Sequence, residues 1–328
     1  MKTIKWGIIG AGNISSTFAT ALNNMENTEL AAVASRDMTR GKEFAARFNA
    51  KKVYDNYEDL AKDEEIDVIY IGTPHSEHVK NAEICIRNKK AVLCEKAFTT
   101  NGKEAKYLME LAKENNVFLM EAMWTKFLPT TIKVKEWIKE GRIGNILNLQ
   151  ASFGFRREMA PTHRLLDPNL SGGALLDVGI YPVTYAIHIM GKLPIHVSSN
   201  AKIGETGVDV QNSIIFQFDK GELVTLNSAI CAEVGKYAVI IGENGKIEVP
   251  LFWSAKEAFL YDGAGKLVDT FKEDTEIKGY EHEAYEVNRC LREGKLESDI
   301  NPLKDTLDIM EIMDGLRKEW GITYPHEK

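Results

Sequence analysis

Residues 4–15, IKWGIIGAGNIS, decide the fold of the N-terminal half. Residues 4–9 form an apolar run of the kind expected for a buried strand in a parallel sheet. Gly10 and Gly12 allow a tight turn in which a pyrophosphate can approach the backbone. The helix that follows offers N–H donors and a partial positive charge at its start. Ser15 holds the third small position of the motif, so close helix–strand packing is expected.

Apolar runs continue to alternate with helical patterns up to residue 122. The expected strands are 29–35, 52–54, 67–72, 91–95 and 117–121, and the expected helices are 39–48, 56–61 and segments beginning near 76 and 101. Repeated βαβ units imply right-handed crossovers and a parallel sheet covered on both faces. The sequence therefore predicts an α/β Rossmann-type doubly wound sheet as a first domain, 1–122.

The pattern changes after residue 123. Leu147, Leu149, Ala151 and Phe153 alternate with polar residues, which is typical of a half-buried antiparallel strand. Further strands are expected at 210–218, 223–231, 237–241, 246–249 and 258–261, separated by turn signals such as Asn244-Gly245. These features predict a second α+β domain, 123–328, with a large, mostly antiparallel open sheet. Whether its final helix, 302–320, packs back on the first domain is left open.

Composition excludes several classes of protein. The chain has 328 residues, and its 41 Lys and Arg against 48 Asp and Glu give a formal charge of −7. This acidic balance argues against nucleic-acid binding. No run of 18 apolar residues is present and the N-terminus lacks a signal-peptide core, so no membrane association is expected. Four scattered cysteines without a CxxC motif favour reduced thiols and a cytoplasmic location.

The end of the second strand predicts which dinucleotide binds. An acidic residue there would select NAD through the ribose hydroxyls, but this chain has Ser35-Arg36. A hydroxyl and a planar guanidinium suit a 2′-phosphate. The prediction is therefore NADP, with NAD as the alternative if Arg36 only faces solvent.

Two segments carry candidate catalytic groups. Lys96 follows the fifth strand, and ligands bind outside the carboxyl ends of strands in such sheets. Asp177 and Tyr181 are four residues apart and share a face wherever the chain is helical. Pro182 argues against a regular helix at Tyr181. No metal site is predicted, because further ligands are missing beside His75 and His78.

At this point the chain resembles the glucose–fructose oxidoreductase/inositol dehydrogenase (Gfo/Idh/MocA) family over its whole length. The resemblance lies in Gly10-Ala11-Gly12-Asn13, Glu95-Lys96 and Asp177-x-x-x-Tyr181. Residues 121–125 (Glu-Ala-Met-Trp-Thr) and 172–182 are similar to the branch with dimeric dihydrodiol dehydrogenases and NADP-dependent D-xylose 1-dehydrogenases. Ala97 departs from the proline that usually follows the lysine.

The resemblance implies an NAD(P)-dependent dehydrogenase that acts on CH–OH groups. It would transfer a hydride between nicotinamide and a secondary alcohol or carbonyl of a sugar, polyol or trans-dihydrodiol. Tyr181 would be the general acid/base, Lys96 its electrostatic partner and Asp177 their orienter, with the reverse assignment of Lys96 and Tyr181 open. Lowering the pKa of a tyrosine by about three units needs roughly 4 kcal/mol, and an ammonium has the correct sign.

The implied sites divide between the two domains. The cofactor residues are Gly10, Gly12, Asn13, Ile14, Ser35, Arg36, Thr73, Pro74, His75, His78, Glu95 and Lys96. The substrate residues in the second domain are Trp124, Phe153, Trp253 and, because it precedes the 172–182 segment, His163. The resemblance also implies a homodimer through the C-terminal sheet.

Two other functions remain on the same fold. One is a regulatory protein that senses the cofactor, and the other is an enzyme that uses transient oxidation for elimination or glycoside cleavage. The joint presence of Lys96 and Tyr181 favours an enzyme, although fold alone does not establish one.

Overall fold

A computed structural model describes residues 2–274 and 278–327. The chain divides into two compact units. One consists of the described residues of 1–123 and 277–310, and the other of the described residues of 124–276 and 311–328.

The first unit is built on a six-stranded sheet in the order β3-β2-β1-β4-β5-β6. All neighbouring strands run parallel, which confirms the predicted doubly wound sheet. Its elements are β1 (Ile4–Ile9), α1 (Asn13–Asn23), β2 (Thr28–Ala34), α2 (Met38–Phe48), β3 (Lys52–Tyr54), α3 (Tyr57–Lys62), β4 (Val68–Ile71), η1 (His75–Glu77), α4 (His78–Arg87), β5 (Ala91–Glu95), α5 (Gly102–Asn115), β6 (Leu119–Ala122) and α8 (Tyr280–Arg292).

The predicted domain boundary needs a correction, because α8 belongs to the first unit although it lies far beyond residue 123. Trp6 in β1 donates from Nε1 to Asn288 Oδ1 at 3.1 Å. The Asn288 amide donates in turn to the Thr28 hydroxyl at 2.9 Å. These buried polar contacts join strands at the start of the chain to a helix near its end.

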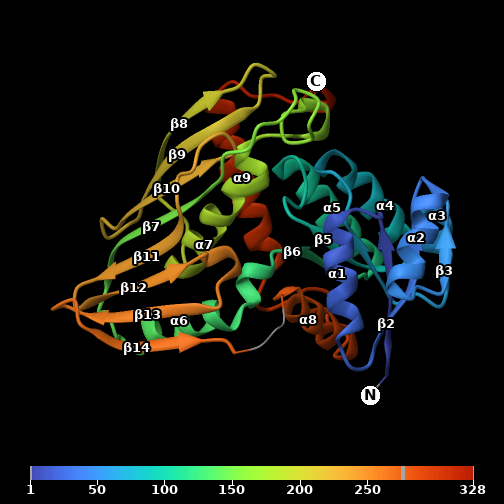
Figure 1. Ribbon diagram of the computed structural model, residues 1–328, viewed down its shortest axis with the longest axis horizontal. Helices are drawn as coiled ribbons and strands as arrows, with labels where there is room; N and C mark the ends of the chain where they lie inside the picture. Colours follow the sequence, from blue (N-terminus) through green and yellow to red (C-terminus); the bar gives the residue numbers. More distant parts are fainter. Residues whose placement is uncertain (1, 275–277, 328) are drawn as a thin grey trace. The chain divides into compact units, whose positions relative to one another are not determined.

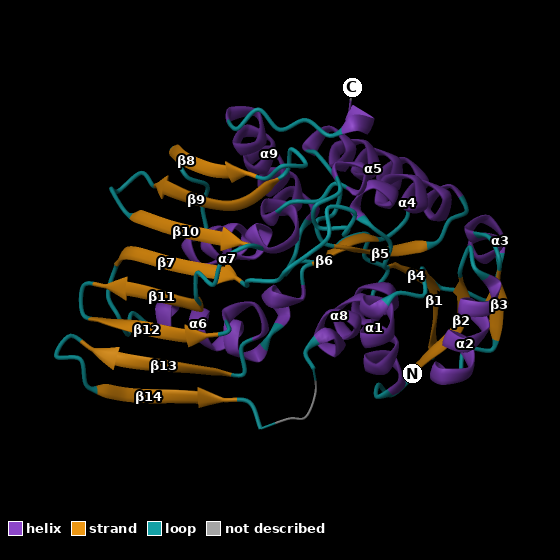
Figure 2. Cartoon of the chain, turned by 45° about the horizontal axis from the view of Figure 1, so that its top comes forward, coloured by secondary structure: helices purple, strands orange, loops and turns teal. Residues whose placement is uncertain are grey.

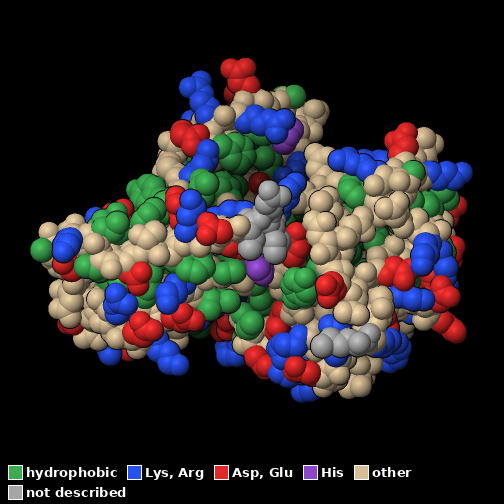
Figure 3. All heavy atoms as spheres, turned by 60° about the horizontal axis from the view of Figure 1, so that its bottom comes forward, with side chains coloured by type: hydrophobic (Ala, Val, Ile, Leu, Met, Phe, Trp, Pro, Cys, Tyr) green, Lys and Arg blue, Asp and Glu red, His purple; other side chains and the backbone are tan. Residues whose placement is uncertain are grey.

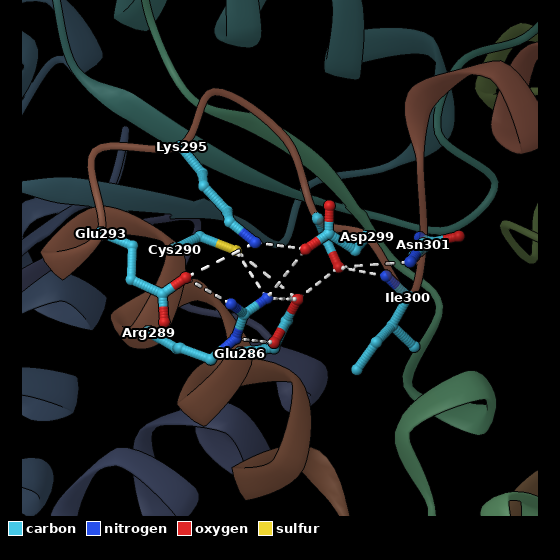
Figure 4. A network of polar contacts seen from close by, with 9 residues as sticks. Glu286, Arg289, Cys290, Glu293, Lys295, Asp299, Ile300 and Asn301 are labelled. Atoms are coloured by element: carbon cyan, nitrogen blue, oxygen red, sulfur yellow. Dashed lines mark hydrogen bonds and ion pairs between the residues drawn. The ribbon is translucent and has the colours of Figure 1, made fainter.

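The end of α8 is fixed to the loop that follows it by a polar network (Figure 4). Glu286 accepts from the Arg289 guanidinium at 2.8 Å and from the Ser298 hydroxyl at 2.5 Å. Arg289 also reaches Glu293 at 2.6 Å. Burial of Glu286 would raise its pKa, but these donors leave the pKa below its ordinary value.

The second unit holds an eight-stranded sheet in the order β14-β13-β12-β11-β7-β10-β9-β8. Figure 2 shows these strands side by side, from β8 at the top to β14 at the bottom. Its elements are η2 (Trp124–Phe127), α6 (Pro129–Lys139), β7 (Ile146–Gly154), η3 (Pro168–Leu170), η4 (Leu175–Gly179), α7 (Ile180–Met190), β8 (His196–Ile203), β9 (Asp209–Gln217), β10 (Leu223–Ala229), β11 (Lys236–Gly242), β12 (Gly245–Pro250), η5 (Phe252–Ser254), β13 (Glu257–Asp262), β14 (Leu267–Lys272) and η6 (Pro325–Glu327). The last long helix, α9 (Leu303–Glu319), begins in the first unit and ends in the second.

The sheet is mostly antiparallel, as predicted, with two differences. β7 and β10 pair in parallel, although 68 residues lie between Gly154 at the end of β7 and Leu223 at the start of β10. β8 and β14 were not expected, because neither carries a strong alternation of buried apolar residues. Both are the outermost strands of the sheet.

One face of this sheet is covered by α6 and α7 (Figure 1). Ile214, Phe216 and Leu226 point to the buried side and are almost fully buried. The segment Pro168–Met190 is long and apolar enough to span a membrane by length and composition, but 89% of its most apolar 18-residue window is buried inside the structure. It is therefore placed as a core segment of the second unit.

Candidate active site

The glycine turn between β1 and α1 fits a dinucleotide. Gly10 has φ +94°, and a Cβ there would lie 3.1 Å from the Gly72 carbonyl oxygen. Gly12 begins α1 without a side-chain cap, and the first turn of the helix carries no acidic residue. The N–H groups of this turn are therefore offered to an anion in a positive helix-end field.

Ser15 packs as its small size predicts. Its side chain is fully buried, and a Cβ on Gly72 would come within 2.3 Å of Ser15 Oγ. A larger residue at either position would push α1 away from the sheet, and with it the turn that begins at Gly10.

Ser35 and Arg36 follow β2 at the predicted place. Arg36 is exposed and lies close enough to Tyr57 to oppose the rise that burial gives to the pKa of that tyrosine. Asp37 accepts from the Arg40 N–H at 3.1 Å and caps α2. The carboxylate of Asp37, which follows Arg36 in the sequence, is thus engaged by the backbone at the start of α2.

Lys96 directly follows β5, and Glu95 anchors it. Glu95 accepts from the Tyr70 hydroxyl at 2.5 Å and from the Lys96 N–H at 3.2 Å. Burial raises the pKa of Glu95 to about 7, while the Lys96 charge opposes that shift. The Lys96–Ala97 peptide bond is cis.

A second buried acid lies near Glu95. Glu283 in α8 is fully buried, and neither of its carboxylate oxygens has a hydrogen-bond partner. Burial raises its pKa well above the ordinary value, and Glu95 and Glu121 add to the effect. Glu283 was not predicted from the sequence, because only the fold brings α8 to this sheet.

The turn after β4 requires one correction to the predicted cofactor residues. Thr73, Pro74 and His75 form this turn, but His78 is fully buried beneath it. Its ring nitrogens face the carbonyl oxygens of Thr73, at 2.8 Å, and Ala97, at 3.0 Å. His78 thus ties this turn to the chain after Lys96 and exposes no surface for a cofactor.

Tyr181 stands at the start of α7 in the second unit. Its hydroxyl oxygen accepts from Trp124 Nε1 at 3.2 Å, and its ring lies 5.6 Å from the Phe153 ring. The expectation of no regular helix at Tyr181 was wrong. Pro182 falls in the first turn of α7, where proline is tolerated, and the irregularity is a π turn at Leu175–Gly179.

Three predicted substrate residues gather around Tyr181. Phe153 and Trp253 stack with ring centroids 3.7 Å apart and an interplanar angle of 7°. The Thr125 hydroxyl donates to the Trp253 carbonyl at 2.8 Å and holds η5 beside η2. With Trp124 these rings form an apolar wall next to one phenol oxygen.

Asp177 forms an ion pair with Arg164, the residue that follows His163 in the loop before the 172–182 segment. Arg164 Nη1 lies 3.0 Å from Asp177 Oδ1. His163 is close enough that Asp177 raises its pKa, although burial, Arg157 and Arg164 together lower it. Arg164 stands in an irregular loop, where no periodic pattern could have predicted its partner.

The structure thus groups the predicted residues within each unit. Trp124, Phe153, Tyr181 and Trp253 form one connected set, and Asp177 joins His163 and Arg164 in another. Lys96 and the glycine turn belong to the first unit. Within residues 2–274 and 278–327 no group of three or more His, Cys, Asp or Glu side chains could hold a metal ion.

These features define an oxidoreductase with a nicotinamide-dinucleotide domain. The chain belongs to the Gfo/Idh/MocA family. Residues 4–123 match the oxidoreductase family with an NAD-binding Rossmann fold, and residues 131–248 match the GFO/IDH/MocA C-terminal domain.

Individual relatives agree with this assignment. The chain is 35% identical to trans-1,2-dihydrobenzene-1,2-diol dehydrogenase of Mus musculus, with 99% of each chain covered. It is 33% identical to D-xylose 1-dehydrogenase (NADP(+)) of Hypocrea jecorina, covering 98% of this chain and 93% of the relative.

Solved structures share the fold. A 3-ketoreductase from Actinomadura kijaniata in complex with NADP and TDP-benzene has a TM-score of 0.87 at 22% identity, covering 97% of this chain and 98% of the other. An aldose-aldose oxidoreductase from Caulobacter crescentus has a TM-score of 0.87 at 18% identity, covering 98% and 99%.

Proposed function

We propose that the protein is an NADP-dependent dehydrogenase that interconverts a secondary alcohol and a carbonyl in a sugar, polyol or trans-dihydrodiol. The observation that carries the proposal is the Tyr181 hydroxyl, held by the Trp124 N–H within an aromatic wall. The dihydrodiol and xylose dehydrogenases among its relatives support this substrate range.

Tyr181 is proposed as the general acid/base. During oxidation its oxygen takes the proton from the substrate hydroxyl, and during reduction it returns that proton. The Trp124 N–H stabilises negative charge on this oxygen. A bound nicotinamide cofactor supplies the hydride acceptor or donor.

Lys96 and Asp177 have supporting roles in the proposal. The Lys96 ammonium favours the ionised phenol, and Glu95 and the β5 strand fix the backbone from which it extends. Asp177, paired with Arg164, orients the polar groups near the substrate. The first unit would bind the cofactor and the second the substrate.

Trp124, Phe153 and Trp253 are proposed to contact the substrate, and so is His163 from the neighbourhood of Asp177 and Arg164. The apolar faces of sugar and dihydrodiol rings pack well on aromatic side chains, and a few polar groups fix orientation. The stacked pair Phe153 and Trp253 offers such a surface.

The experiment that tests the function is reduction of NADP⁺ followed at the nicotinamide absorbance. Aldoses, inositols and trans-dihydrodiols should be scanned as substrates, with both NADP⁺ and NAD⁺. Turnover with at least one of these classes is expected. No signal with any of them would contradict the proposal and favour a protein that only binds the cofactor.

Replacing Arg36 by alanine should reduce the preference for NADP⁺. A charge-assisted hydrogen bond to the 2′-phosphate contributes about 1.5–3 kcal/mol, so kcat/KM for NADP⁺ should fall roughly 10- to 100-fold. The value for NAD⁺ should change little. Arg47→Ala, at the exposed far end of α2, is the control. An equal loss with both cofactors would remove Arg36 from the phosphate site.

The open face of the eight-stranded sheet is proposed as a homodimer interface. Ile215, exposed by 46%, lies in one cross-strand row with Val239 and Phe259, in which Thr225, Gln150 and Glu248 stand between them. Figure 3 shows hydrophobic side chains at the surface of the second unit, interspersed with charged ones. Apolar area of this kind on an antiparallel sheet needs cover.

Sedimentation of the purified protein should give the mass of a dimer. Ile215→Lys should shift it toward the monomer, because a buried unpaired charge disfavours association. Ile132→Lys, on the exposed side of α6, is a matched control, since Ile132 is 43% exposed. A monomer in the unmodified protein would contradict the proposal.

A cytoplasmic location is also part of the proposal. Cys85, Cys94, Cys231 and Cys290 are all free thiols in the structure. Disulfides are rare in reducing compartments, so four unpaired cysteines favour such a compartment.

A further inference from the structure

The π turn that precedes Tyr181 is held at its start by an acidic side chain from the sheet. The Leu175 N–H donates to Asp209 Oδ2 at 2.9 Å. Gly173 has φ +124°, and a Cβ there would lie 2.5 Å from Asp209 Oδ1. The glycine therefore allows the chain to pass directly over the carboxylate before it enters η4.

The same side chain is connected to the other end of the turn. Asn212 Nδ2 donates to Asp209 Oδ2 at 2.8 Å. The Ser228 hydroxyl donates to Asn212 Oδ1 at 2.8 Å. A Cβ on Gly179 would lie 2.8 Å from that hydroxyl oxygen, so the last residue of η4 rests on Ser228.

These three residues, Asp209, Asn212 and Ser228, form what we call the turn support. All three are buried, with 1%, 2% and 0% of their surface exposed. Asp209 and Asn212 lie in β9 and Ser228 in β10, so the support is part of a rigid antiparallel pair. A carboxylate only accepts hydrogen bonds, so Asp209 fixes the direction of the Leu175 N–H without ambiguity.

Asp209 is buried, and burial opposes the charge on its carboxylate. Burial raises the pKa of Asp209 to about 6, while the amide of Asn212, the Leu175 N–H and the charge of Arg317 lower it. The charge of Asp209 in turn adds to the rise that burial gives to the pKa of Tyr324. The Tyr324 hydroxyl donates to the Gly172 carbonyl at 2.6 Å, so a second contact holds the chain just before the turn.

We propose that Asp209 is a positioning residue for the Tyr181 hydroxyl, acting through the Leu175 N–H at the start of the π turn. The turn support sets where Asp177 and Tyr181 lie over the sheet. This inference rests on the proposed catalytic role of Tyr181. It adds a group outside the substrate site whose loss misplaces the phenol.

The test compares Asp209→Ala with Asp209→Asn. The alanine variant loses the acceptor for Leu175, and kcat should fall about 10-fold or more, because a small misplacement of a reacting group has large effects on rate. The KM for NADP⁺ should stay within about twofold, because the change acts on the position of the phenol and leaves cofactor binding intact. Asparagine keeps an oxygen that can accept from Leu175 and Asn212, so kcat should recover to within about threefold of the unmodified protein.

A second comparison separates positioning from a general loss of structure. In the Tyr181→Phe background, Asp209→Ala should lower the residual kcat less than about twofold, because residues that act as a unit are not additive. Val224→Ala, which removes buried volume from β10, is the stability control and should lower the melting temperature without this kcat pattern. If Asp209→Ala does not fold, Asn212→Ala removes one donor to the same carboxylate and should give a smaller loss with the same pattern.

The inference is overturned if Asp209→Ala folds with unchanged kcat, if it loses the same factor in both backgrounds, or if Asp209→Asn is as poor as alanine. The single variant Tyr181→Phe tests the proposed catalytic role separately from the role of Asp209. If that variant is fully active, Tyr181 has no catalytic role and Asp209 has no phenol to position.

Discussion

The Tyr181→Phe variant is expected to lose at least about 10²-fold in kcat, in the range typical for removal of a general acid/base. Phenylalanine keeps the ring that packs 5.6 Å from Phe153. It removes only the oxygen that accepts from Trp124. The fold and the KM for NADP⁺ should therefore change little, and steady-state rates at the nicotinamide absorbance measure the effect.

α7 offers a matched control for this change. Tyr185 lies one turn further along the same helix, is fully buried, and its hydroxyl has no hydrogen-bond partner. Tyr185→Phe should leave kcat within about twofold, because no interaction is lost. Equal losses in the two variants would point to packing of α7 and not to chemistry at Tyr181.

The Lys96→Met variant should show a comparable loss in kcat, about 10²-fold or more. Methionine fills similar space without the ammonium, so charge stabilisation of an ionised phenol disappears. In the direction of alcohol oxidation, where the phenol must be ionised to act as base, the acidic limb of the pH profile of kcat/KM should then move to higher pH. Measured rates across a pH series give both effects.

Lys80→Met is the control for Lys96, since Lys80 is exposed on α4 in the same unit. The double variant Lys96→Met, Tyr181→Phe tests whether the two groups act on the same step. Its loss should be much smaller than the product of the single losses. Independent, fully multiplicative losses would contradict the assignment of Lys96 as partner of Tyr181.

Local sequence signals were sufficient for most of the first unit. Gly10, Gly12 and Ser15 lie within six residues of one another and determine the turn and the close helix–strand contact between them. The β1–α1 connection could therefore be predicted from the local sequence. The place of α8 could not be predicted in the same way. It depends on the contact of Trp6 with Asn288, 282 residues apart, and no periodic pattern links the two.

The site shows the same division between local and distant contacts. The aromatic residues Trp124, Phe153 and Trp253 were predicted, and the structure places them around Tyr181. The pairing of Arg164 with Asp177 and the contact of Asp209 with Leu175 were not predicted, because loop geometry sets the first and strand register the second. β9 also carries Gln211, Asn212, Ser213 and Gln217, so no sequence signal distinguished Asp209 from its polar neighbours.

The contact between Trp6 and Asn288 also bears on how the polypeptide acquires its shape as it is made. Chains emerge from the ribosome with the N-terminus first, and early segments begin to fold before later ones exist. The β1–β6 sheet is synthesised within the first 123 residues, but its partner α8 follows only after 279. The whole second sheet is therefore translated before α8 can supply Asn288 as the partner of Trp6, so the buried indole N–H of β1 gains this acceptor only late in synthesis.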